Sequence, residues 1–280
     1  MDFFIGRKVV IATKHKKEEA ITPILENELG LLCVLPKDLD TDRLGTFSGE
    51  VERIDDPVTT LRKKCQMAID ASGINLAIAN EGSFGAHPTI FFAHADDEFI
   101  MLLDKENGIE IIERELSLNT NFDGTEIKSE DELIAFANKI GFPSHGIILK
   151  KGKNNYSGII KESRAFEELI KNYHKIKNED GIAYAETDMR AMFNPTRMKI
   201  IEQAAIKLTK KAKSLCPSCS TPGFGVVDAE KGLPCEMCGM PTRSTLKHIY
   251  RCQKCNFQMG KEFPFEKQFE DPQYCDFCNP

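Results

Sequence analysis

The sequence predicts an α/β fold, with a mixed, partly parallel sheet and flanking helices over residues 1–213, followed by a small cysteine-rich module over residues 214–280. Two observations carry this prediction. Short apolar runs typical of strands alternate with amphipathic stretches typical of helices, which is the order of an α/β domain. Eight of the ten cysteines lie between Cys216 and Cys278, and this change of composition marks a domain boundary near residue 214.

The first half of the α/β domain alternates between strand and helix. Strands are predicted at residues 8–13, 31–36 and 75–80. Pro23 suits the first turn of a helix that runs to Leu29 and ends at Gly30. Asp56 suits a helix N-cap, with Pro57 at the first helical position.

The second half begins with a hairpin and continues the alternation. Asn107 and Gly108 predict a tight turn between two strands, and Ser129 with Glu132 forms a capping box for a helix. The predicted elements are strands at 98–104, 109–117, 145–151 and 181–186, and helices at 129–141, 163–176 and 194–213.

Composition excludes some classes of protein. No apolar run approaches the roughly 18–20 residues of a membrane span, and the first residues lack the pattern of a signal peptide. We therefore expect a cytosolic protein that does not act in a membrane. The net charge of −6 argues against electrostatic binding of nucleic acid by the protein surface as a whole, because such binding requires a basic face.

The cysteine-rich module over residues 214–280, called the tail below, contains four C-x-x-C pairs. These pairs are separated by gaps of 15, 13 and 19 residues. Two such pairs aim four sulfurs at one tetrahedral ion, so four pairs predict two structural zinc sites of a zinc-ribbon-like module. Disulfides, a thioredoxin-like redox couple and iron–sulfur clusters are the alternatives. The predicted metal ligands are Cys216, Cys219, Cys235, Cys238, Cys252, Cys255, Cys275 and Cys278.

The order in which the pairs share an ion is open between two arrangements. Consecutive pairing joins neighbouring pairs along the chain, with ordinary zinc-ribbon gaps. Nested pairing joins the second pair to the third and the first to the fourth. The hairpin-like pattern of residues 235–257 favours nesting.

Nucleic-acid binding by this module is a weaker alternative. From Cys216 to the end the chain has seven Lys and Arg against eight Asp and Glu, and thiolates add negative charge. A small basic cluster lies in the predicted hairpin, at Arg243, Lys247, Arg251 and Lys254. A solvated strand face that offsets the thiolate charge is the favoured interpretation of this cluster.

Ligands of open α/β sheets bind beyond the carboxyl ends of strands, so the loops that follow strands are candidate sites. The loop after the first strand carries Thr13, Lys14, His15, Lys16 and Lys17, next to a helix N-terminus. This combination suits phosphate. An exposed basic turn is the equal alternative.

A second candidate site is the predicted loop after the strand at 75–80. It contains Asn80, Glu81, Gly82, Ser83 and Gly85, in which small residues allow close approach of a ligand and an acid suits a metal ion or a nucleotide. A plain glycine turn is the alternative. Nearby, His94, Asp96 and Asp97 are further candidate metal ligands, although a polar hairpin edge is the favoured interpretation.

A third candidate site precedes the last helix and contains Glu186, Asp188, Arg190, Asn194 and Arg197. Guanidinium groups bind phosphate through two hydrogen bonds. Internal salt bridges and a helix cap explain the same residues equally well.

The overall layout of the chain includes the motifs "GTFSGE", "IANEGSFGAHP", "ETDMRAMFNPTRM" and the four C-x-x-C pairs. In this layout and these motifs, the chain resembles a family of uncharacterised bacterial proteins over nearly its full length. Residues 8–90 are similar to the opening of inosine/xanthosine triphosphate pyrophosphatases, which carry a Thr-x-Asn-x-x-Lys element after the first strand. Thr13 matches this element, whereas His15 and Glu18 occupy its other two positions. The resemblance implies that Glu81 takes the place of a magnesium-binding acid.

These residues favour a metal-dependent enzyme that acts on a nucleotide or another phosphorylated small molecule. Mg²⁺ near Glu81 would polarise a phosphate, and Lys17 and Arg190 would offset its charge. One alternative is a zinc-stabilised ligand-binding or regulatory protein without catalysis. The other is a nucleic-acid-associated zinc-ribbon factor.

Overall fold

The computed structural model describes residues 3–36, 39–45 and 54–280. The chain forms two compact units, of which the first comprises Met1–Glu106 with Ile112–Thr209 and the second Asn107–Ile111 with Lys210–Pro280. The predicted fold class is confirmed: the chain is mixed α/β, with a partly parallel sheet, flanking helices and two four-cysteine groups. Most of the motif "GTFSGE", residues 46–50, lies outside the described residues.

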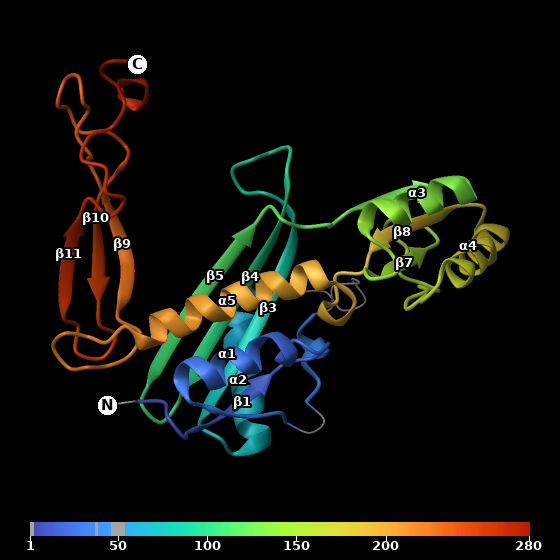
Figure 1. Ribbon diagram of the computed structural model, residues 1–280, viewed down its shortest axis with the longest axis horizontal. Helices are drawn as coiled ribbons and strands as arrows, with labels where there is room; N and C mark the ends of the chain where they lie inside the picture. Colours follow the sequence, from blue (N-terminus) through green and yellow to red (C-terminus); the bar gives the residue numbers. More distant parts are fainter. Residues whose placement is uncertain (1–2, 37–38, 46–53) are drawn as a thin grey trace. The chain divides into compact units, whose positions relative to one another are not determined.

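A five-stranded sheet in the order β2-β1-β3-β4-β5 is the centre of the first unit (Figure 1). Its strands are β1 (Lys8–Ala12), β2 (Leu32–Val34), β3 (Leu76–Ala86), β4 (His94–Asp104) and β5 (Ile109–Ser117). Strand β1 is parallel to both β2 and β3. Strands β3 and β4 pair antiparallel over their whole length, from Leu76 opposite Asp104 to Ala86 opposite His94.

Helices cover both faces of this sheet. They are α1 (Glu18–Leu29), α2 (Pro57–Ser72) and α5 (Pro195–Lys213). Helix α2 packs against Ala77, Ala79 and Met101, whose side chains share one face. Because side chains alternate along a strand, Asn80 and Glu98 point to the opposite face, where α1 and α5 lie (Figure 1).

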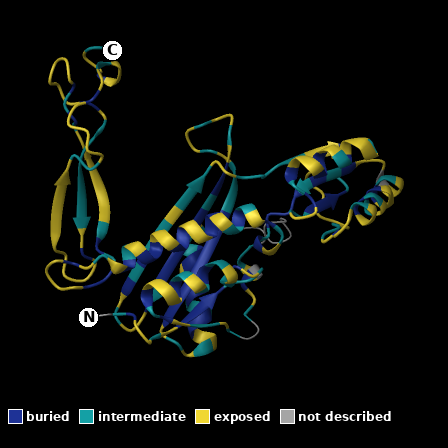
Figure 2. Cartoon of the chain, in the orientation of Figure 1, coloured by how far each residue is buried: buried dark blue, intermediate teal, exposed yellow. Residues whose placement is uncertain are grey.

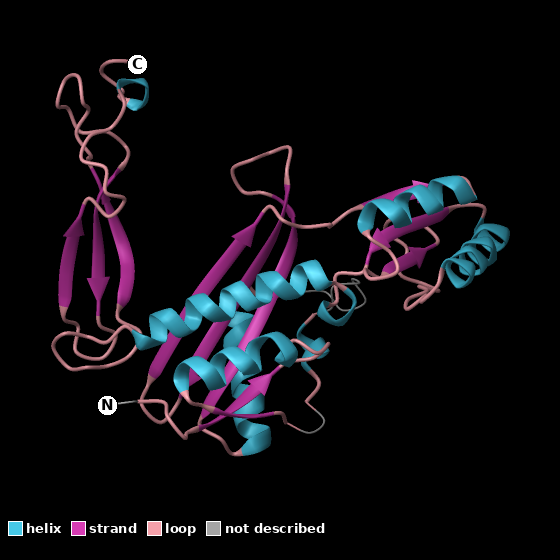
Figure 3. Cartoon of the chain, viewed as in Figure 1, coloured by secondary structure: helices cyan, strands magenta, loops and turns pink. Residues whose placement is uncertain are grey.

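A smaller sheet in the order β6-β8-β7 forms the rest of the first unit (Figure 3). Its elements are β6 (Gly124–Ile127), β7 (Ile147–Lys150) and β8 (Ala183–Thr187), with α3 (Glu130–Ile140) and α4 (Phe166–Asp180). Leu133 of α3 and Leu169 of α4 pack on the sheet residues Leu149 and Ala185 in a common core.

The second unit holds an antiparallel sheet of β9 (Gly225–Lys231), β10 (Thr245–Arg251) and β11 (Gln258–Glu262), in which β10 is central. Most residues of β9 and β11 are exposed (Figure 2). Short 3-10 helices occur at Thr41–Leu44, Ala191–Phe193 and Pro272–Tyr274.

Several local predictions are confirmed. The Asp56 side chain accepts hydrogen bonds from the backbone N–H groups of Val58 and Thr59 at the start of α2. Ser129 caps α3 by accepting from the backbone N–H of Glu132. Gly30 ends α1 in the left-handed conformation, with φ of 65°.

Two of the predicted boundaries that differ from the structure bear on the candidate site. Helix α1 begins at Glu18 and contains Pro23 in its interior, because the apolar positions Ile21 and Leu25 anchor a longer helix to the core. The predicted glycine loop after residue 80 is part of β3, which continues to Ala86. Pairing with β4 satisfies the backbone of this segment and outweighs the low strand propensity of its glycines.

Candidate functional site

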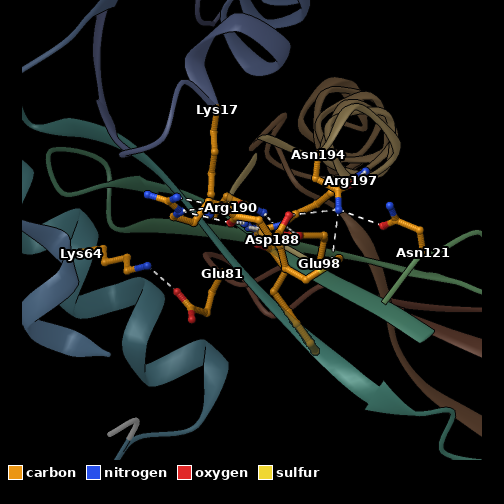
Figure 4. Close-up of polar contacts among 12 residues, drawn as sticks. Lys17, Lys64, Glu81, Glu98, Asn121, Asp188, Arg190, Asn194 and Arg197 are labelled. Carbon is orange, nitrogen blue, oxygen red and sulfur yellow. Dashed lines mark hydrogen bonds and ion pairs between the residues drawn. The ribbon is translucent and has the colours of Figure 1, made fainter. Parts of the chain in front are cut away.

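The extension of β3 separates two neighbouring candidate residues. Asn80 and Glu81 are adjacent in the chain, and strand alternation therefore sends their side chains to opposite faces of the sheet. Glu81 lies on the face of α2, where it forms an ion pair with Lys64. Asn80 lies on the other face, with Lys17. Figure 4 shows the Lys64–Glu81 pair on one side of the strand and Lys17 on the other.

Lys17, Asn80, Glu98 and Arg197 form a buried polar cluster between α1, α5 and the sheet. The Lys17 Nζ donates to Asn80 Oδ1 at 2.8 Å, and Asn80 Nδ2 donates to Glu98 Oε2 at 2.9 Å. Arg197 Nε donates to the other Glu98 oxygen at 2.6 Å. Arg197 and Glu98 are fully buried. Four separate segments thus hold one hydrogen-bonded series of three ionisable side chains and one amide.

Asp96 is a fully buried acid on the same face of β4 as Glu98. Neither of its carboxylate oxygens accepts a hydrogen bond from the residues that the structure describes. A buried carboxylate without donors is costly. Asp96 therefore either holds a proton, which it can donate to Glu98, or requires a further group as a partner.

The electrostatics of the cluster follow from burial and from its neighbours. Burial lowers the pKa of Lys17 to about 7, and the charge of Arg197 acts in the same direction. Burial raises the pKa of Asp96 to about 8, and the charge of Glu98 adds to this effect. Burial alone would raise the pKa of Glu98, but the charges of Arg197 and Lys17 bring it below its usual value.

Gly82 provides the space for this arrangement. A Cβ atom at Gly82 would lie 2.3 Å from Glu98 Oε1 and 2.7 Å from Arg197 Nη2. The absence of a side chain at residue 82 thus lets the Arg197–Glu98 pair lie directly against the backbone of β3.

The segment before α5 connects this cluster to the smaller sheet. Asn194 Oδ1 accepts from the backbone N–H of Arg197 and caps the helix. Arg197 Nη1 donates to the backbone oxygen of Met189 at 2.5 Å. Asp188 accepts from the guanidinium of Arg190, with Nη2 to Oδ2 at 2.7 Å. Both alternatives for this segment, a ligand site and internal ion pairs with a cap, therefore stay open.

A pocket of about 250 Å³ opens beside these residues. Asp188 and Arg190 line it together with Lys150 and Glu186, whose side chains form an ion pair at 2.6 Å. Aromatic side chains supply much of the remaining wall, from Phe84, Phe122, Tyr156 and Tyr184. The pKa of Glu186 is raised above its ordinary value, because the effect of burial exceeds the opposing effect of Lys150.

Other predicted site residues lie elsewhere. In the loop before α1, Lys14 pairs with Asp40 at 2.6 Å and Lys16 with Glu19 at 3.3 Å, and only Lys17 enters the cluster. His15 and Lys16 have left-handed backbones, and the Thr13 hydroxyl donates to the backbone oxygen of Lys14. Ser83 and Gly85 have the strand parity of Glu81, so they do not face the cluster.

Sequence reasoning missed Glu98 and gave Asp96 a minor role. The available signal is alternation, because Asp96 and Glu98 share a strand face with the apolar Ile100 and Leu102. Acids at inward positions of a buried strand are rare unless they are paired or functional.

In the tail, the eight cysteines form two groups of four. Within each group, all four sulfurs lie within 4.8 Å of one another. No disulfide joins these cysteines. Sulfurs of facing pairs are 3.6–3.8 Å apart. Metal–thiolate bonds of about 2.3 Å in a tetrahedron separate the sulfurs by about 3.8 Å. The donor set therefore fits one ion in each group.

The order of the pairs differs from both predicted arrangements. The first pair shares a group with the third, as Cys216, Cys219, Cys252 and Cys255, and the second shares a group with the fourth, as Cys235, Cys238, Cys275 and Cys278. Both nested and consecutive pairing are thus wrong. The antiparallel sheet explains the interleaving: β9 and β10 return the chain beside the first group, and the second group forms at the opposite ends of these strands.

Two of the four cations in the predicted basic cluster of the tail are in ion pairs. Arg243 pairs with Asp276 at 3.0 Å, and Lys247 pairs with Glu230 at 2.7 Å. This favours the offsetting of nearby acidic charge over contact with nucleic acid. No helix in the described part of the chain has the length and apolar character to cross a membrane.

The fold and the two cysteine groups define a mixed α/β protein with a C-terminal module of two four-cysteine centres. The chain belongs to the family described as a domain of unknown function (DUF6671), whose model matches residues 64–280. This confirms the resemblance to an uncharacterised family. No curated protein matches the chain, and the likeness to inosine/xanthosine triphosphate pyrophosphatases stays a prediction.

Proposed function

We propose that the protein is a zinc-stabilised, metal-dependent enzyme whose α/β unit acts on a nucleotide or another phosphorylated small molecule. The observation that carries this proposal is the Asp96 carboxylate, which is buried beside Glu98 and accepts no hydrogen bond from the described residues. Carboxylate oxygens are the ligands that Mg²⁺ prefers. Asp96 and Glu98 would hold such an ion, which would offset negative charge on a phosphate.

The neighbouring pocket supports the choice of ligand. Its aromatic side chains suit a planar base, and Arg190 and Lys150 supply positive charge. Its volume of about 250 Å³ suits a small molecule rather than a polymer. Lys17 and Arg197 add positive charge near the proposed ion, which matches a phosphorylated ligand better than a neutral one.

The proposed role of zinc is structural. Four thiolates per group, without an open position for water, are typical of structural zinc sites. Elemental analysis of purified protein should find about two zinc ions per chain. Iron in place of zinc, or protein that is folded without metal, would contradict this part of the proposal.

A pair of carboxylate variants tests the catalytic part. Asp96→Asn should abolish Mn²⁺ binding, measured by electron paramagnetic resonance, and lower Mg²⁺-dependent phosphate release from nucleoside triphosphates by about a hundredfold or more. Glu81→Gln is the matched control, because Glu81 is a buried acid of the same sheet that pairs with Lys64 on the opposite face. Loss of activity in Glu81→Gln alone would move the site to that face and refute the role of Asp96.

Ligand binding without turnover is the second candidate. Under either candidate, a ligand in the pocket contacts Lys17, Asp96 and Glu98 only after a local opening of the chain, because all three are buried. Under this alternative, nucleotides raise the melting temperature and Arg190→Ala weakens this effect, while no variant changes a rate because no turnover occurs.

A further inference from the structure

The second cysteine group, formed by Cys235, Cys238, Cys275 and Cys278, has unusually apolar surroundings. Met237 lies inside one C-x-x-C turn and is 74% exposed, and Phe277 lies inside the other and is 64% exposed. Further exposed apolar side chains lie next to these turns in the sequence. The tip surface, as we name it, consists of Met237, Met240, Phe269, Tyr274 and Phe277.

The cysteine group brings together the two C-x-x-C turns that carry or adjoin most of these residues. The Sγ atoms of Cys238 and Cys275 are 3.7 Å apart, and those of Cys235 and Cys278 are 3.8 Å apart. Each tip residue except Met240 and Phe269 is the neighbour of one of these cysteines in the sequence. Phe269 is held near by Glu270, whose backbone pairs with that of Pro234 and Glu236.

The first cysteine group has different surroundings. The corresponding positions in its turns are the polar residues Ser218 and Lys254. Phe224, beside Tyr250 and Phe257 at 5.8 and 6.0 Å between ring centroids, packs with the sulfurs of this group. Gln253 bonds through its side chain to the backbone of Glu110 at 2.9 and 3.1 Å. Phe224 of the first group is therefore buried within the second unit, whereas Met237 and Phe277 of the second group are exposed, although Leu215 and Phe257 near the first group are exposed as well.

Metal binding does not require this composition. The turns of the first group show that polar residues serve the same geometry, and exposed Met and Phe side chains contribute nothing to the sulfur shell. Methionine and aromatic side chains are enriched at the centres of protein interfaces, and clustered exposed apolar residues mark interaction sites.

The charge around the tip surface indicates the kind of partner. Residues 233–241 and 269–280 contain four acids and no Lys or Arg. Two of the acids have a neighbouring cation, since Asp276 pairs with Arg243 and Glu270 with Lys267. Glu236 and Asp271 are exposed at the rim. An apolar centre with an acidic rim complements a segment that is apolar and basic.

We propose that the tip surface docks a basic, amphipathic segment of another protein. The apolar side chains of that segment would cover Met237, Tyr274 and Phe277, and its lysines or arginines would face Glu236 and Asp271. This inference does not depend on the activity of the α/β unit. A small contact of this kind fits transient binding rather than a permanent complex.

Two synthetic peptides test this proposal on the full, zinc-loaded chain. Both are amphipathic helices of about 16 residues with the same leucine positions, and their polar positions are all lysine in one and all glutamate in the other. Fluorescence anisotropy should show saturable, salt-sensitive binding of the lysine peptide only. Equal binding of both peptides, or none of the lysine peptide, would overturn the proposal.

Paired variants locate the contact. Met237→Ser with Phe277→Ser should weaken binding of the lysine peptide by about tenfold or more. The matched control is Val227→Ser with Met259→Ser, which removes two exposed apolar side chains from β9 and β11, and it should leave binding within about twofold. Equal weakening by both pairs would refute the tip surface. Zinc content of each variant shows that its sulfur shells are intact.

Self-association that depends on Met237 and Phe277, seen by analytical ultracentrifugation, would replace the basic segment with a second copy of the chain and overturn the proposal as stated.

Discussion

The α/β unit and the cysteine tail solve the burial of charge in different ways. In the α/β unit, Lys17, Glu98 and Arg197 come from distant segments and are joined through hydrogen bonds inside a large apolar core, with Glu98 and Arg197 as a buried ion pair. In the tail, charged sulfurs lie on turns, and the described core around the first group is limited to Cys216, Phe224 and Cys252, with Tyr250 packed against it. The first unit is stabilised by its own side chains, whereas the tail has two four-cysteine groups that could each hold an ion.

Removal of metal is the strongest test of this difference. We expect a chelator to unfold the tail, because structural zinc contributes about 10–16 kcal/mol to the folding of small domains. The α/β unit should keep its fold. Hydrogen exchange measured by mass spectrometry should show loss of protection in β9–β11 and unchanged protection in β1, β3 and β4. Equal loss in both units would show that they are not independent.

The interleaved order of the cysteine pairs makes a prediction about stoichiometry. Cys216→Ser with Cys252→Ser places both substitutions in one group, so one zinc ion should remain. Consecutive or nested pairing would place them in different groups and remove both ions. Elemental analysis distinguishes these outcomes, and Cys33→Ser, outside both groups, should retain two ions.

The buried ion pair of the α/β unit should be more important for stability than an exposed one. Arg197→Met leaves the charge of Glu98 buried without its main partner, and such changes cost about 3–5 kcal/mol. Arg114→Met is the matched control, because Arg114 also pairs with an acid of β4, Asp97, but is 45% exposed. Its removal should cost about 1 kcal/mol or less. Urea unfolding measures both, and similar losses would contradict the comparison.

The same contrast explains which features were predictable from the sequence. The eight cysteine ligands were evident because the geometry of a C-x-x-C turn is local. Their grouping was not, since it depends on how β9 and β10 pair. Asp56 and Ser129 were recognised as caps for the same local reason.

The cluster in the α/β unit was only partly predictable. Lys17, Asn80 and Arg197 were candidates because of their residue types, but their contact arises from tertiary packing of three separate segments. Glycines at Gly82 and Gly85 indicated a loop, and the long pairing of β3 with β4 overrode that local preference. This register decides that Glu98 lies opposite Gly82 and that Glu81 faces α2.

The smallest expected effect concerns His145, which lies beside the start of α5. Burial lowers its pKa, and its Nε2 lies 2.9 Å from the Thr196 hydroxyl. The folded state then binds fewer protons than the unfolded state, whose pKa is about 6.5. The stabilisation is present above that value and is lost as the pH falls through the lowered folded pKa.

Relative to His145→Gln, the wild-type chain should therefore lose stability between pH 7 and pH 5. Because His145 is partly exposed, solvent screening should keep this loss small. Urea unfolding at the two pH values measures it. If the difference in unfolding free energy between the two proteins does not change with pH, the neutral imidazole is not what stabilises the contact between His145 and the start of α5.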